Sequence, residues 1–143
     1  MKVKVSRIST VAPAMPTAKN SMFLSAIDIS NIPSNNVGLL LFYKIPDITA
    51  AKDFPTMVEK LKTSLSLVLV DFYPFAGRLD RKGAESGRPQ IDCNDEGVEF
   101  VEATIDMAFE DVKIDNFQHK NFFTELVQMR HGKDDDSLLS IQV

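Results

Sequence analysis

The sequence is poor in the residues that build common catalytic and metal sites. It has 143 residues with no tryptophan, one cysteine (Cys93) and two histidines (His119 and His131). A single cysteine excludes an internal disulfide and fits a reducing compartment, and two histidines are too few for the usual zinc ligand sets. Because no activating pattern surrounds Cys93, we expect a packed thiol at a strand end and not a nucleophile.

The signals of several large function classes are also missing. No G-x-G-x-x-G, P-loop or G-x-S-x-G pattern occurs, so dinucleotide, phosphate-loop and serine-hydrolase functions have no motif. The net charge is −4, and no basic stripe with interleaved aromatic residues is present, which argues against nucleic acid as a partner. No apolar run approaches about 18 residues, and lysines interrupt the start of the chain, so we predict neither membrane span nor signal peptide, and a cytoplasmic location.

What the chain does contain is the composition of a soluble globular protein, with 44% hydrophobic and 25% charged residues, and the length of one ordinary domain. Residues 2–8 alternate polar and apolar, which predicts a half-buried strand. Residues 11–20 hold Pro13 and Pro16 and predict an extended connector. The apolar run 37–45, ended by Pro46, predicts a central strand covered on both faces.

From Asp53 onward, hydrophobic residues recur at three- and four-residue steps, which predicts one long amphipathic helix. Asp53 is the expected N-cap, and Pro74 is expected to end the helix. Gly77 is expected to take a positive φ in the exit turn, with Arg78 anchoring it. The predicted apolar face comprises Phe54, Met57, Val58, Leu61, Leu65, Val68, Leu69 and Phe72. The predicted solvent side comprises Glu59, Lys60, Lys62, Ser64 and Ser66.

The second half of the chain predicts further strands around an irregular segment. Residues 88–94 and 97–105 predict two strands joined by the turn N-D-E-G, which indicates a hairpin. Residues 107–127 predict irregular chain or short helical turns, and 133–137 a polar loop. Residues 138–143 predict another strand, and we expect its apolar Leu139, Ile141 and Val143 to leave an unfinished, aggregation-prone edge.

Residues 71–80, D-F-Y-P-F-A-G-R-L-D, resemble the Tyr-Pro-Leu-Ala-Gly-Arg-Leu stretch of the BAHD acyltransferases, plant acyl-CoA-dependent enzymes that include the hydroxycinnamoyl transferases. Four further segments resemble elements of the same family and occur in the same order: A-P-A-M-P-T (12–17), L-S-A-I-D-I (24–29), L-K-T-S-L-S-L-V-L-V-D-F-Y-P (61–74) and I-D-C-N-D-E-G-V-E-F-V-E-A (91–103). The resemblance covers nearly the whole chain, and its last segment is most similar to hydroxycinnamoyl transferases.

This resemblance implies a chloramphenicol acetyltransferase-like fold of two α/β domains, with a tunnel that admits acyl-CoA from one side and the acceptor from the other. Residues 1–143 would form an incomplete N-terminal domain with a mixed sheet and one long amphipathic helix. In the family, a histidine acts as general base on an acceptor hydroxyl or amine, which attacks the thioester. The implied function is acyl-CoA-dependent O- or N-acyl transfer to a plant metabolite, with acyl-CoA as co-substrate and no bound cofactor.

His131 and Asp135 have the spacing of the family's His-x-x-x-Asp-Gly element, but we interpret them as a surface coincidence. The family element follows the strand that residues 138–143 resemble, whereas His131 precedes it, and Asp136 stands where the family has glycine. The second signature, Asp-Phe-Gly-Trp-Gly, is absent. We therefore expect a chain truncated before the catalytic segment, inactive alone, with no catalytic, cofactor-binding or metal-binding residue.

Other interpretations stay open beside this one. The chain could be a non-catalytic interaction or regulatory protein that pairs an exposed sheet edge with another chain. A small-molecule binder that uses half of the tunnel wall is weaker, because pockets usually bury about 70–90% of their ligand. His119 is interpreted as a surface or partly packed residue, and Arg78 as an anchor of the helix exit and not as a ligand of a CoA phosphate.

Overall fold

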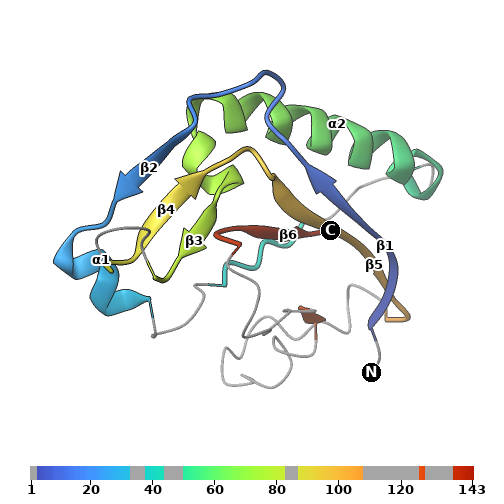
Figure 1. Ribbon diagram of the computed structural model, residues 1–143. Coiled ribbons are helices and arrows are strands. Elements are labelled where there is room, and N and C mark those ends of the chain that lie inside the picture. The colour runs from blue at the N-terminus through green and yellow to red at the C-terminus, as the bar shows by residue number, and fades with distance from the viewer. Residues whose placement is uncertain (1–2, 33–37, 44–49, 83–86, 108–125, 128–136) are drawn as a thin grey trace.

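Two small sheets lie beneath one long helix in the computed structural model (Figure 1). The structure describes residues 3–32, 38–43, 50–82, 87–107, 126–127 and 137–143. The elements follow one another as β1 (Val3–Val11), β2 (Asn20–Phe23), α1 (Ala26–Asn31), α2 (Ala50–Asp71), the 3₁₀ turn η1 (Tyr73–Ala76), β3 (Arg78–Asp80), β4 (Gln90–Cys93), β5 (Val98–Ile105) and β6 (Ser140–Gln142).

The first sheet has the order β1-β5-β6 and is mixed, as the sequence predicts. β1 runs antiparallel to β5 from the pair Val3 and Ile105 to the pair Val11 and Val98, and β6 runs parallel to β5. The strands predicted at 2–8 and 138–143 are therefore confirmed. The predicted unfinished apolar face is wrong, because the apolar side chains of the last strand pack against the core: Leu139, Ile141 and Val143.

The second sheet has the order β2-β4-β3, with antiparallel pairing throughout. The hairpin predicted from residues 88–105 is wrong, because β4 and β5 belong to different sheets. Both edges of β4 are already occupied, by β2 and by β3. The N-D-E-G turn contains two left-handed residues, Asp95 at φ 58° and Gly97 at φ 94°, which send the chain from one sheet into the other.

Helix α2 confirms the predicted long amphipathic helix, with different ends. It begins at Ala50, so Asp53 lies in its first turn and is not the N-cap. Helix-favouring alanines before Asp53 extend the helix backwards. It ends at Asp71, and Pro74 lies in the 3₁₀ turn that follows. Gly77 has φ −89°, so the predicted positive φ is also wrong.

Only half of the predicted apolar face of α2 faces the core. Val58 and Leu69 are 2% and 1% exposed. They join a buried cluster with Val11, Ala76, Val98 and Phe100, and Phe54 and Leu65 pack against it. The other half of that face is exposed to solvent: Met57, Leu61, Val68 and Phe72.

The strand predicted at 37–45 is wrong for the six residues that the structure describes. Residues 38–43 have no regular secondary structure, and Leu39, Leu41 and Tyr43 are 81%, 60% and 76% exposed. A strand exists only where a neighbour satisfies its backbone groups, and no described strand pairs with this segment. Most of 107–127 and 133–137 lies outside the described residues, so those two predictions are not tested.

Candidate functional site

The candidate catalytic residues of the sequence lie outside the described part of the chain. His119, His131 and Asp135 all fall in the segments 108–125 and 128–136. Their interpretation as surface residues therefore stays a prediction. The chain has only these two histidines, so the described ranges contain no histidine that could act as a general base.

The Y-P-F-A-G-R motif lies where the two sheets meet, at a site that we call the sheet junction, residues 73–78 and 94–97. Ala76 is fully buried, and its carbonyl accepts a hydrogen bond of 2.8 Å from the Gly97 amide. Gly77 lies so close to β4 that a Cβ atom there would be 2.3 Å from the Asp92 carbonyl oxygen. The motif's glycine is therefore required by close backbone approach.

Arg78 binds the two halves of the sheet junction together. Its Nη1 donates to the carbonyl oxygens of Gly77 at 2.8 Å and of Gly97 at 2.9 Å, and its Nε forms an ion pair of 2.9 Å with Glu96. A planar guanidinium suits such a forked set of acceptors. These contacts are those of an anchor at the helix exit.

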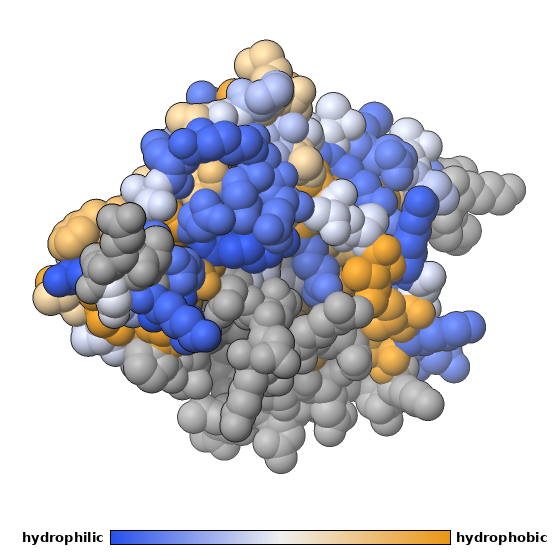
Figure 2. All heavy atoms as spheres, in the orientation of Figure 1, coloured by the Kyte–Doolittle hydropathy of each residue, from blue (hydrophilic) through white to orange (hydrophobic). Residues whose placement is uncertain are grey.

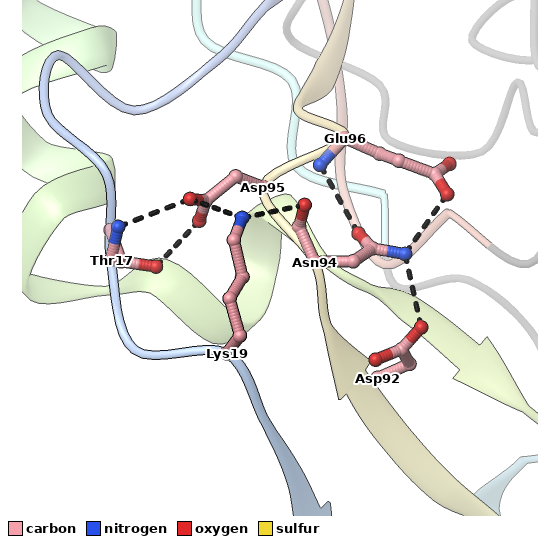
Figure 3. A network of polar contacts seen from close by, with 6 residues as sticks. All are labelled: Thr17, Lys19, Asp92, Asn94, Asp95 and Glu96. Atoms are coloured by element: carbon pink, nitrogen blue, oxygen red, sulfur yellow. Dashed lines mark hydrogen bonds and ion pairs between the residues drawn. The ribbon is translucent and has the colours of Figure 1, made fainter.

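Asp95 ties the connector after β1 to the sheet junction, in the network shown in Figure 3. Its carboxylate accepts hydrogen bonds from the hydroxyl and the amide of Thr17 and from the ammonium of Lys19, which also donates to the Asn94 carbonyl at 2.8 Å. The hydrogen bonds from Lys19 and Thr17 lower the pKa of Asp95 to about 2. Sequence reasoning missed this network, although an aspartate in an N-D-E-G turn is one signal of it.

Asn94 organises the outer side of the same turn (Figure 3). Its side-chain amide donates to Asp92 at 3.2 Å and to Glu96 at 2.9 Å, and its side-chain oxygen accepts from the Glu96 amide. An asparagine that closes a turn on its own backbone is a common structural device. Together with Asp95, it fixes the path of the chain between β4 and β5.

Cys93 is the packed strand-end thiol that the sequence predicts. It is the last residue of β4 and is 1% exposed. Burial raises the pKa of the thiol, and the nearby carboxylates of Asp92 and Asp95 raise it further. A buried thiol with a raised pKa gives little thiolate, so Cys93 is a poor nucleophile.

The contacts of the sheet junction among the described residues are structural. No group of three or more metal-ligating side chains exists among the described residues, and they include no helix long and apolar enough to cross a membrane. The sheet junction positions backbone, fixes a turn and joins two sheets. Its polar groups bind one another and hold the fold.

Comparison with known proteins shows where this scaffold belongs. The model of the transferase family matches residues 1–143, the whole chain. The chain belongs to the BAHD acyltransferase family. Membership in the BAHD family also supports the predicted chloramphenicol acetyltransferase-like α/β fold class.

Curated BAHD relatives match the chain with one third of residues identical or more. The 13-hydroxylupanine O-tigloyltransferase of Lupinus albus is 35% identical over 99% of this chain and 31% of its own length. The hydroxycinnamoyltransferase of Narcissus pseudonarcissus is 38% identical over 78% of this chain and 24% of its own length. The anthranilate N-benzoyltransferase protein 1 of Dianthus caryophyllus has the same identity, and the match covers 26% of its own length.

This BAHD chain thus spans about a quarter to a third of the relatives that it matches. Among solved structures, vinorine synthase is similar over 73% of this chain and 24% of its own, with 24% identity and a TM-score of 0.37. Relatives named for different acyl groups match at similar identity. The hydroxycinnamoyl branch therefore stays a prediction.

Proposed function

We propose that this chain contributes the N-terminal scaffold of an acyl-CoA-dependent acyltransferase, which transfers an acyl group from a CoA thioester to a hydroxyl or amine of a plant metabolite. The observation that carries the proposal is the family match across residues 1–143. The relatives' names, which include O- and N-acyltransferases, support the reaction class. Cys93 is a free cysteine, which fits a reducing compartment, and this supports a cytoplasmic location.

In this proposal, the described residues position the reaction and do not perform it. The core packed between α2 and β5 and the sheet junction supply a rigid scaffold. The general base would come from a His-x-x-x-Asp-Gly element that residues 1–143 do not include, and acyl-CoA would bind only when that part is present. His131 is not assigned this role. It precedes β6 in the sequence, whereas the family's His-x-x-x-Asp-Gly element follows the strand that residues 138–143 resemble.

A chimera tests the reaction class. Residues 1–143 would replace the matched segment of the Lupinus albus relative, 31% of its length, and the purified chimera would be assayed with tigloyl-CoA and 13-hydroxylupanine. We expect acyl transfer, because the scaffold completes the catalytic part. A chimera that folds, as judged by circular dichroism, but releases no CoA would contradict the proposal.

The isolated chain tests the second half of the proposal. Purified residues 1–143, assayed with hydroxycinnamoyl-CoA or acetyl-CoA and excess alcohol acceptor, are expected to show no acyl transfer above background. The control is His131→Ala, which is expected to behave identically. Turnover by the native chain that disappears in His131→Ala would show that His131 is catalytic after all.

A non-catalytic regulatory protein is the second candidate, favoured by the edge of the first sheet. β6 is a parallel strand of three residues, and no further described strand lies beyond it. An open edge can add a strand from another protein. Size-exclusion chromatography with a full-length relative tests this function. Co-elution of a stable complex is expected if the chain is regulatory, and two unchanged separate peaks would exclude it.

A further inference from the structure

Helix α2 turns toward the core a stripe of side chains that includes a lysine. The stripe, which we call the buried stripe, recurs at three- and four-residue steps and comprises Phe54, Val58, Lys62, Leu65 and Leu69. Its four apolar members belong to the core cluster or pack against it. The sequence predicts Lys62 on the solvent side of the helix, and that prediction is wrong, because the side chain of Lys62 is only 14% exposed. A charge held this far from water needs a compensating partner.

A second stripe on α2 is entirely apolar, yet it faces outward. This apolar stripe shares only Leu65 with the buried stripe and comprises Met57, Leu61, Leu65, Val68 and Phe72. Apart from Leu65, its members are 36–57% exposed, and Figure 2 shows hydrophobic and hydrophilic side chains mixed along the upper side of the molecule, where α2 lies in Figure 1. Three residues advance about 300° around a helix, so the two stripes lie about 60° apart. Hydrophobic burial alone favours the apolar stripe, so another interaction sets the rotation of α2.

Lys62 finds its partners on β5. Its ammonium donates a hydrogen bond of 2.7 Å to the Glu102 carboxylate and lies 5.3 Å from the centre of the Phe100 ring. Phe100 and Glu102 are two residues apart on the strand, so they share one of its faces. The side chain of Glu102 is 14% exposed, whereas that of Glu59, 3.6 Å from the same ammonium, is 68% exposed. Exposed ion pairs contribute little, but removing one member of a buried pair leaves an uncompensated charge.

We propose that the ion pair of Lys62 and Glu102 is a conformational selector, which sets the rotation of α2 on the first sheet. With the pair formed, the buried stripe faces β5 and the apolar stripe faces outward. Without the carboxylate of Glu102, Lys62 would be a charge held between helix and strand with no buried anion beside it. A rotation of α2 by about 60° would then return Lys62 to water and bury the apolar stripe instead. The pair thus decides which face of the helix the scaffold presents to its surroundings.

Two labelling reactions on the folded chain measure this rotation. Acetic anhydride followed by mass spectrometry reports the exposure of Lys62, with the exposed Lys60 on the same helix as internal reference. A thiol reagent reports the exposure of the apolar stripe through a Leu61→Cys variant, because Leu61 is 44% exposed and the native Cys93 is buried. Loosening of the helix would raise both signals, whereas a rotation raises the first and lowers the second.

Three single substitutions separate the causes that could set the rotation. Glu102→Gln removes the buried carboxylate charge with almost no change of shape, and Glu59→Gln is the matched control at the exposed carboxylate beside the same lysine. Ser66→Ala is a second control, which removes the hydrogen bond of 2.8 Å from the Ser66 hydroxyl to the Ala12 carbonyl. The double variant Lys62→Glu with Glu102→Lys restores the pair with exchanged charges, and circular dichroism checks the folding of every variant.

In the native chain, Lys62 should react at least tenfold more slowly than Lys60. Glu102→Gln should bring the two rates within twofold and slow the labelling of Leu61→Cys at least tenfold, and the exchanged pair should restore rapid labelling of Leu61→Cys. The two controls should behave as the native chain. The proposal is overturned if Glu102→Gln unfolds the chain, if Lys62 stays protected or Leu61→Cys stays open in that variant, or if either control has the same effect. None of these outcomes depends on acyl transfer, so the proposed function is tested separately.

Discussion

Replacing Gly77 by alanine is expected to destabilise the protein strongly, although the change adds a single methyl group. The new Cβ atom would lie 2.3 Å from the carbonyl oxygen of Asp92 and 3.1 Å from that of Pro74. Ordinary contacts are 3.4 Å or longer, so the backbone must move by about 1 Å. Asp92 lies in β4, the central strand of the second sheet, between β2 and β3.

The size of the effect follows from what has to move. Neither atom is the end of a flexible side chain, so β4 or η1 must shift as a unit. Overpacking of this kind costs about 1–3 kcal/mol, and one weakened ladder hydrogen bond adds about 1 kcal/mol. We therefore expect a loss of about 2–4 kcal/mol in the free energy of unfolding, which corresponds to a fall in Tm of about 10 °C.

Gly87→Ala is the control for the backbone effect of the same substitution. Gly87 has φ +65°, and nothing lies within 4 Å of the position that a Cβ atom would take there, so only the dihedral cost of about 1 kcal/mol applies. Both variants would be unfolded with urea and with heat and followed by circular dichroism. If Gly77→Ala loses no more stability than Gly87→Ala, close backbone approach is not the reason for the motif's glycine.

Further predictions concern the core, the Asp95 network and the cysteine. Val58→Ala should lower the free energy of unfolding by about 2 kcal/mol, because Val58 is 2% exposed. Val68 is 51% exposed, so Val68→Ala should lower it by less than about 0.5 kcal/mol. Urea unfolding measures both variants. The pKa of Asp95 is lowered to about 2, so its stabilisation is present above the unfolded-state pKa near 4 and disappears as the pH falls through about 2. Asp95→Asn should therefore lose less stability between pH 5 and pH 2 than the native chain, and an equal loss would contradict this assignment. Cys93 should react with a thiol reagent only after denaturant is added, since it is buried; rapid stoichiometric labelling of the native protein would contradict its packing.

The long helix could be predicted from its periodicity, although only half of the periodic apolar face is turned to the core. Val58 and Leu69 recur on the face that meets β5, and the structure places both in the core. Its start could not be predicted, because a capping residue such as Asp53 is equally favourable inside the first turn, beside the helix dipole. The contacts of Arg78 agree with its interpretation as an anchor of the helix exit, but the reason for the glycine beside it required the position of β4.

The hairpin and the central strand failed for a different reason. A turn such as N-D-E-G specifies local backbone angles, but which strands pair is decided by distant segments: β2 and β3 already occupy both edges of β4. The apolar run 38–43 has the composition of a strand that is covered on both faces. Whether other strands and side chains cover it is decided by distant segments, and no described strand pairs with it. For the candidate site, the interpretation of His131 and Asp135 rests on their order relative to 138–143, and it stays a prediction because both residues lie outside the described part of the chain.

The pairing of β1 with β5 sets a constraint on synthesis. Val11 lies opposite Val98, and Val3 lies opposite Ile105, so the first strand pairs with residues about 90 to 100 positions later. At about 5–20 residues per second, a ribosome needs several seconds to produce that partner. During this time the N-terminal strand has both edges open. The alternating lysines, arginine and serines of residues 2–9 keep the waiting strand soluble until β5 emerges.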